Sequence, residues 1–198
     1  MMNFACNEHL RIAYETSDEV LRGVRWQSDQ MIDATTVLNF MRQRYCPGIE
    51  LYARSFAGLT SSAGSIGNSG AMMWIEFDGR PKSAVIVLNS DMPMEYQRFS
   101  LFQQLGHLAT LPPDVPVDQD SYHVSTRIDY DLTDITAEEL DNDYYLMREQ
   151  VANVFALRVL MPSDQFYQKL RKLDSVSAAA RFFGLGPDAV ISRMMIGG

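Results

Sequence analysis

The sequence predicts an α+β fold, in which helices precede and follow a small group of strands. The clearest strand signals lie between residues 51 and 88, and helical periodicity occurs on both sides of them. A chain of 198 residues can bury about 70% of its unfolded surface, so it needs no disulfide or structural metal to hold a core. We therefore expect one compact domain, or a domain with a small appendage.

Two helices are predicted before the strands. Ser17-Asp18-Glu19 is typical of a helix start, and the apolar residues that follow it fall on one face. A second helix is expected over residues 34–45, with Val37, Leu38 and Met41 directed inward. Pro47-Gly48 ends this helix.

Three strands are predicted at residues 51–56, 73–77 and 84–88. The last of these is apolar throughout, which is expected of a strand buried on both faces. The Gly- and Ser-rich residues 57–71 between the first two strands predict a loop. This loop lacks a Gly-Lys-Ser/Thr ending, so a phosphate-binding loop is excluded.

Helical signals resume after the strands, from Glu95 to about Leu111. A short strand over residues 122–128 is expected next. Thr136 and Glu139 form a capping box that opens a helix continuing to Leu160. A short helix beginning at Ser163 and two helices in the last twenty residues, separated by residues 184–187, complete the order.

Acidic residues are concentrated in residues 114–143. This segment has ten Asp and Glu residues against Arg127 alone, a charge of −9 in a chain whose net charge is −8. Such a field opposes direct nucleic-acid binding and attracts a basic protein partner. The alternative is a solvated insertion without a binding role.

Cys6 and Cys46 are too few for a disulfide framework, and we expect them to be reduced. The N-terminus has no basic start followed by an apolar run, which argues against a secretory signal. No segment approaches the roughly 18 to 20 apolar residues of a membrane helix. The sequence therefore predicts a cytoplasmic protein without a membrane segment.

Gln103-Gln104-Leu105-Gly106-His107 is the pattern that bears on chemistry. In zinc peptidases, His-Glu-x-x-His places two imidazole ligands on one helical face, and the glutamate between them accepts a proton from metal-bound water. Here Gln103 and Gln104 stand at the first histidine and the glutamate, and only His107 remains. Taken alone, His107 is as well explained as a hydrogen-bonded core residue.

Three ordered segments of the sequence support the interpretation that residues 103–107 are a changed zinc-peptidase motif. They are residues 84–108, from Ala-Val-Ile-Val-Leu-Asn-Ser-Asp-Met-Pro to Leu-Gly-His-Leu; residues 149–162, from Glu-Gln-Val-Ala-Asn-Val-Phe-Ala to Leu-Met-Pro; and residues 178–193, with Arg-Phe-Phe-Gly-Leu-Gly. Together they resemble the ImmA/IrrE family of metallopeptidases over roughly residues 35–198. The resemblance implies a zincin-like domain over residues 35–174 and a helix-turn-helix-like pair over residues 175–198. Residues 1–34 lie outside the resemblance and are expected to form a helical extension, and the acidic residues 114–143 are expected to be an insertion in the domain.

The resemblance also implies roles for matching residues. His107 and Glu149 would be metal ligands, and Asn153 would orient a ligand. Gln104 cannot act as a general base, so we predict no catalytic residue at this position. Gln103 is a weak zinc ligand, and we predict weak or absent zinc and no other cofactor. His123 is an alternative third ligand.

We further expect the two glutamines to hydrogen-bond with Glu149 and Asn153, so that no buried group of the former metal cavity stays unpaired. With these substitutions, the family resemblance implies a catalytically inactive regulator, and we expect it to bind a basic protein, such as a helix-turn-helix repressor from a phage or mobile element. One alternative is a zinc endopeptidase with a rearranged site that cleaves a repressor. Another is a toxin–antitoxin-type interaction module, although Arg181 and Arg193 offer too little positive charge for DNA.

Overall fold

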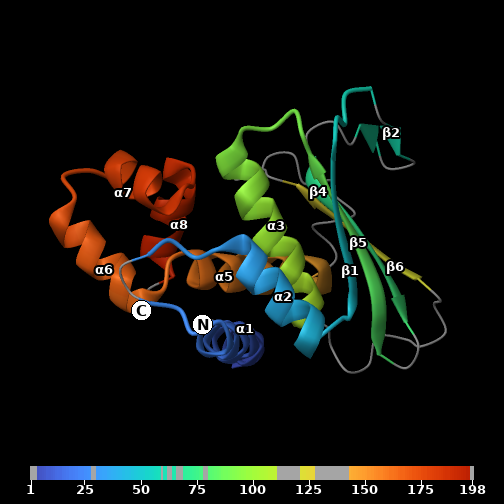
Figure 1. The fold of residues 1–198 in the computed structure, drawn as a ribbon, viewed down its shortest axis with the longest axis horizontal. Coiled ribbons are helices and arrows are strands. Elements are labelled where there is room, and N and C mark those ends of the chain that lie inside the picture. Colours follow the sequence, from blue (N-terminus) through green and yellow to red (C-terminus); the bar gives the residue numbers. More distant parts are fainter. Residues whose placement is uncertain are drawn as a thin grey trace.

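A computed structural model describes residues 4–27, 30–58, 60–61, 64–65, 69–77, 80–110, 121–127 and 143–196. Two of its helices, over residues 34–44 and 94–109, pack against one face of a small mixed sheet, and the other described helices lie on the same side of it, as expected for an α+β fold (Figure 1). The helices are α1 Phe4–Gly23, α2 Ala34–Arg44, α3 Met94–Ala109, α5 Asp143–Leu160, α6 Ser163–Lys172, α7 Val176–Phe183 and α8 Pro187–Met195. The strands are β1 Gly48–Arg54, β2 Thr60–Ser61, β3 Gly64–Ser65, β4 Ser69–Phe77, β5 Pro81–Asn89 and β6 Ser121–Arg127.

The main sheet has the order β1-β5-β4-β6. Strands β1 and β5 are parallel, whereas β4 runs antiparallel to both of its neighbours, β5 and β6. The predicted strands are therefore present, and the segment expected at 122–128 is β6. Strands β2 and β3, which form a separate pair, lie inside the segment predicted to be a loop.

Strand β5 is buried on one face, which corrects the expectation from its apolar sequence. Its alternate residues Ala84, Ile86 and Leu88 are buried beneath the helices, but Val85 and Val87 are only partly buried on the opposite face. A short apolar run does not distinguish a strand covered on both faces from one covered on a single face. Because the described helices lie on one side of the sheet (Figure 1), none of them covers the other face of β5.

The first helix begins earlier than predicted. Helix α1 starts at Phe4, so Ser17 lies inside it. The Ser17 hydroxyl is fully buried and donates a hydrogen bond to the carbonyl of Tyr14 at 2.8 Å. A helical serine commonly bonds to the preceding turn in this way, and it then no longer marks a helix start. Helix α1 packs along α5 and contributes Ala13 and Val20 to the common core.

Helix α2 agrees with the sequence prediction, and Val37, Leu38 and Met41 are its buried residues. The Asp33 carboxylate accepts hydrogen bonds from the Thr36 amide at 2.8 Å and from the Thr36 hydroxyl at 2.7 Å. These bonds lower the pKa of Asp33. An ionised cap at this end satisfies free helical amides and interacts favourably with the helix dipole.

The C-terminal helices are tied to the core by Arg193, which is fully buried. Its Nε donates to the carbonyl of Met161 at 3.1 Å, and its Nη2 donates to the Ser163 hydroxyl at 2.8 Å. Its guanidinium also lies over the Phe166 ring. Arg193 is therefore engaged within the fold and is not presented to a nucleic acid.

Two sequence predictions fall partly outside the described residues. The capping box at Thr136–Glu139 lies there, and α5 is described from Asp143 onward. Most of the acidic segment 114–143 also lies there, except for β6 and the start of α5. None of the helices that the structure describes is long and apolar enough to cross a membrane.

Candidate functional site

The candidate site forms where α3 crosses α5. Ten consecutive residues of α3, Phe99 to Leu108, are buried, so this part of the helix is enclosed on every side. At the crossing, a Cβ added to Gly106 would lie 2.9 Å from the Ala152 carbonyl oxygen and 2.9 Å from Cδ1 of Phe155. The two backbones can approach this closely only because residue 106 has no side chain. Gly106 therefore brings the polar side chains of the two helices into contact.

Gln103, His107 and Glu149 meet at this crossing. The Gln103 side-chain amide donates to Oε2 of Glu149 at 3.0 Å, and Nε2 of His107 lies 3.0 Å from Oε1 of the same carboxylate. Gln103 and His107 are both 2% exposed, and the Glu149 side chain is 16% exposed. The spacing of four residues puts Gln103 and His107 on one face of α3, so Glu149 of α5 contacts both.

Several polar atoms of this cluster have no hydrogen-bond partner among the described residues. They are Oε1 of Gln103, Nε2 of His107, Oε1 of Glu149 and Oδ1 of Asn153, all of them buried. The short contact between His107 and Glu149 thus does not have hydrogen-bond geometry, although the two atoms are close. The expectation that the amides would leave no buried group unpaired is wrong within the described part of the chain, because the Gln103 amide bonds Glu149 through its nitrogen alone.

Gln104 and Asn153 lie on the same two helices as this contact. Gln104 is fully buried on α3, and Asn153 lies on α5 one turn after Glu149. An amide neither gains nor loses a proton near neutral pH. Together with Gln103, His107 and Glu149, these two residues make up what we call the polar cluster, in which three of the five side chains are amides.

The residues of this crossing do not fit the zinc site that the family resemblance implies. Catalytic zinc sites use three protein ligands drawn from His, Cys, Asp and Glu. Where the structure describes the chain, no group of three such residues could hold a metal ion. The Gln103 position is filled by an amide whose NH₂ group points at the carboxylate that would bind the metal. We therefore derive no catalytic step through a metal.

Two further residues lie on elements that contact α3: His123 on β6 and Arg148 on α5. His123 is on β6, where it pairs with Trp74 of β4, and its side chain lies outside the described ones, so its role as a third ligand stays a prediction. Arg148 directly precedes Glu149, and burial lowers its pKa, while the Glu149 charge acts in the opposite direction. Arg148 is not among the residues predicted from the sequence, although a basic residue adjacent to an expected ligand is a visible signal.

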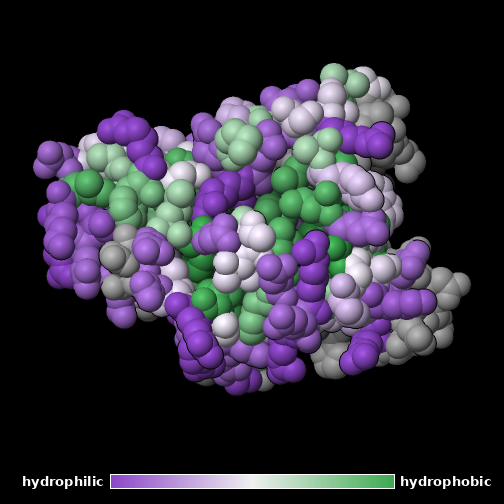
Figure 2. Space-filling model, in the orientation of Figure 1, coloured by the Kyte–Doolittle hydropathy of each residue, from purple (hydrophilic) through white to green (hydrophobic). Residues whose placement is uncertain are grey.

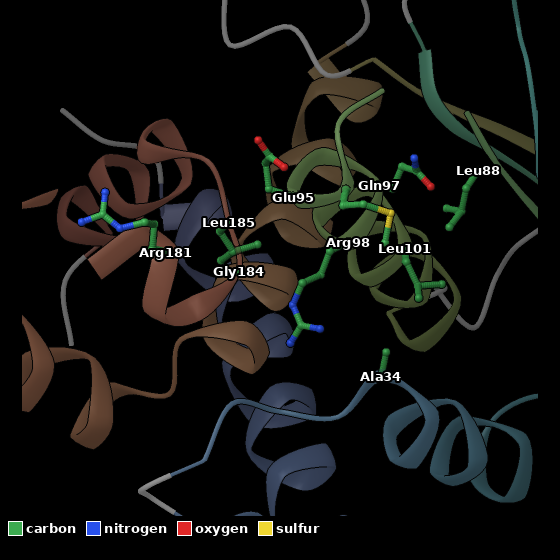
Figure 3. A pocket seen from close by; sticks show the side chains of 10 residues that line it. Ala34, Leu88, Glu95, Gln97, Arg98, Leu101, Arg181, Gly184 and Leu185 are labelled. Atoms are coloured by element: carbon green, nitrogen blue, oxygen red, sulfur yellow. The ribbon is translucent and has the colours of Figure 1, made fainter. Parts of the chain in front are cut away.

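A separate pocket of about 470 Å³ lies at the other end of α3 (Figure 3). Its lining combines apolar residues from α2, β5 and α3 with Arg98 and the α7–α8 turn. Arg98 donates to the carbonyl of Ile32 at 2.6 Å, and burial lowers its pKa. The pocket residue of α3 that is nearest to His107 in the sequence is Leu101, about two helical turns before it. The pocket is therefore distinct from the polar cluster.

Comparison with protein families is consistent with this geometry. The family model of the IrrE N-terminal-like domain, which represents the M78 peptidases, matches residues 68–195. This range contains β4, β5, α3 and α5, and thus every residue of the polar cluster. No curated protein matches the chain.

Proposed function

Because this chain belongs to the ImmA/IrrE family of metallopeptidases, with a zincin-like fold, we propose that it is a catalytically inactive member that acts by binding a protein partner. One observation carries the proposal: the amide of Gln103 bonds to the carboxylate of Glu149 at the position of the first imidazole ligand. Gln104, at the position of the general base, cannot accept a proton. Loss of a general base typically lowers the rate by about 10²- to 10⁴-fold.

The proposed partner is a basic regulator, such as a helix-turn-helix repressor, in the cytoplasm. The support is the charge of residues 114–143, where ten acids stand against one arginine. Complementary charge accelerates association and selects against acidic partners. In the sequence, the acidic segment runs directly into α5, the helix that carries Glu149.

The metal part of the proposal is tested by comparing the wild type with a variant in which the family residues are restored. Gln103→His/Gln104→Glu would place a second imidazole on the His107 face and a general base beside it. We expect the purified wild type to contain well under one zinc per chain and to keep its melting temperature when a chelator is added. The restored variant is expected to bind zinc and to gain about 2.7 kcal/mol at a free zinc concentration of about 100 Kd.

The measurements are metal content by plasma mass spectrometry and thermal unfolding with and without zinc. One tightly bound zinc in the wild type would contradict the proposal and would favour the alternative, a zinc endopeptidase with a rearranged site. In that case chelator should also stop the cleavage of a partner. If neither protein binds zinc, then Glu149 is not placed as a third ligand.

The binding part is tested with a purified helix-turn-helix repressor as the probe, at low and at high salt. We expect retention at low salt, loss of retention as salt screens the acidic segment, and no cleavage of the retained probe. A matched variant with Asp129, Asp131 and Asp134 changed to Asn should bind more weakly. Equal binding by the variant, or no binding of any basic probe at low salt, would contradict this part.

A further inference from the structure

Among the described residues, the outer side of β1 is an open strand edge. In the order β1-β5-β4-β6, the strand β1 is terminal, and within the described chain it pairs with β5 alone. The Arg54 carbonyl accepts a hydrogen bond from the Ser90 amide, on the β5 side. The Ile49 carbonyl instead accepts from the Arg42 guanidinium of α2, at 3.0 and 3.1 Å.

These two hydrogen bonds establish which backbone groups point outward. In a strand, the N–H and C=O of one residue point to the same side, and successive residues alternate. Even-numbered residues from 50 to 54 therefore bond toward β5, while Ile49, Leu51 and Ala53 direct their backbone groups outward. Because Arg42 covers the Ile49 carbonyl, the open section is Leu51 to Ala53.

The side chains of this section are exposed and partly apolar. Leu51 is 37% exposed and Tyr52 is 46% exposed, although Ile49 of the same strand is buried. The neighbouring strand presents the partly buried Val85 and Val87 on the Tyr52 face. In Figure 2, hydrophobic surface also gathers between α3 and β1. An exposed edge with apolar side chains and without proline or lysine is a site for strand pairing.

The residues along the edge identify the partner. The sequence Glu50-Leu51-Tyr52-Ala53-Arg54 has opposite charges at equal distances from Tyr52. When two copies of the strand run antiparallel with Tyr52 opposite Tyr52, each Glu50 faces Arg54 of the partner subunit. In the same register Leu51 faces Ala53 of the partner subunit, and both of these residues point their backbone groups outward. About four hydrogen bonds form across the two pairs, as antiparallel pairing requires.

We propose that two copies of this chain associate through β1 in this antiparallel register, forming one continuous sheet. The arrangement is closed by a twofold axis at Tyr52, so the association stops at a dimer. A parallel in-register pairing would place Glu50 opposite Glu50, and the shared charge opposes it. The open section is short, so the interface is small, and we expect a reversible dimer with a dissociation constant that is roughly micromolar.

The test is sedimentation velocity of the full chain over about 1 to 200 μM, with charge variants. Glu50→Arg and Arg54→Glu each replace two attractive cross-strand pairs with two repulsive ones, so we expect each to weaken the dimer at least about tenfold. The double variant Glu50→Arg/Arg54→Glu restores opposite charges across the axis and should return the dissociation constant to within about threefold of the wild type.

A proline variant tests the backbone bonds. Ala53→Pro removes an outward N–H and leaves the bonds to β5 in place, because proline is tolerated on an edge strand. It should abolish the dimer with little change in the circular dichroism spectrum. Trp74→Ala, on β4, which β5 separates from β1, is the matched control: Trp74 is 38% exposed, and its loss should leave the dimer intact.

Three results would overturn the proposal. They are a wild type that stays monomeric over the whole concentration range, a dimer that tolerates each single charge reversal, and a charge swap that fails to restore association. If Ala53→Pro alters the spectrum, the charge swap decides the outcome independently of it. None of these outcomes depends on zinc or on the protein partner, so the dimer and the proposed function can fail separately.

Discussion

Replacing Gly106 by alanine tests whether the α3–α5 crossing depends on a missing side chain. A Cβ at this position would lie 2.9 Å from the Ala152 carbonyl oxygen, 2.9 Å from Cδ1 of Phe155 and 3.1 Å from Cα of Ala152. Favourable contacts between carbon atoms are about 3.5 to 4.0 Å. Two of the three nearest atoms belong to the backbone of α5, so a change of rotamer cannot relieve them all. The helices would have to separate by roughly half an ångström.

Two opposing effects determine the magnitude. Overpacking in a well-packed core costs about 1 to 3 kcal/mol. Alanine stabilises a helix interior by about 1 kcal/mol relative to glycine. We therefore expect Gly106→Ala to lower the free energy of unfolding by a net of about 1 to 2 kcal/mol, since the backbone contacts put the steric cost in the upper part of its range. For a chain of this size, the melting temperature should fall by about 2 to 8 °C.

The assay is thermal unfolding followed by circular dichroism, with urea unfolding as a second measure. Ser177→Ala, at an exposed position of α7, is the control: it gains helix propensity without a steric contact and should change stability by less than about 0.5 kcal/mol. An unchanged or higher melting temperature for Gly106→Ala would refute the reasoning. It would mean that residues other than Gly106 set the distance between α3 and α5.

Two further predictions concern other parts of the fold. Arg193→Ala should lower the free energy of unfolding by about 2 to 4 kcal/mol in urea titrations, because it leaves two acceptors unpaired and opens a cavity. Arg193→Lys should recover less than half of this loss, because a single ammonium group cannot reproduce the several donors of a guanidinium group. The second prediction is loss of stability in acid. Hydrogen bonds from Thr36 lower the folded-state pKa of Asp33, so its contribution is present above the unfolded pKa of about 3.9 and is lost as the pH falls through the folded pKa. Urea midpoints from about pH 6 to about pH 3 should therefore fall less steeply for Asp33→Asn, which still caps α2.

The periodicity of apolar residues predicted the helices and strands that are buried on one face only. In α2, the spacing of Val37, Leu38 and Met41 identified both the helix and its inward face. The same reasoning failed for Ser17, because a serine that caps a helix and one that bonds to the preceding turn are alike in sequence. It also failed for the outer face of β5, since the coverage of a strand depends on where distant helices pack.

The candidate site was predictable in part. The spacing of four residues placed Gln103 and His107 on one face of α3, but the contact with Glu149 required the resemblance to a family, because no local pattern joins two helices more than forty residues apart. The orientation of the Gln103 amide was beyond prediction. Whether its oxygen or its nitrogen faces Glu149 depends on the groups around it, and the nitrogen is the side that can bond to a carboxylate.

The structure separates the packing role of the α3 motif from its chemical role. Gly106 acts through the absence of a Cβ, which lets α3 and α5 approach whatever stands at positions 103 and 104. Gln103 and Gln104 change ligand strength and proton affinity, but they are buried on α3 without breaking the helix. The crossing of α3 and α5 therefore does not require a zinc ligand at position 103 or a general base at position 104. Restoring His and Glu at these two positions should then cost little stability, and zinc binding by that variant is the direct measure of how far the alignment persists.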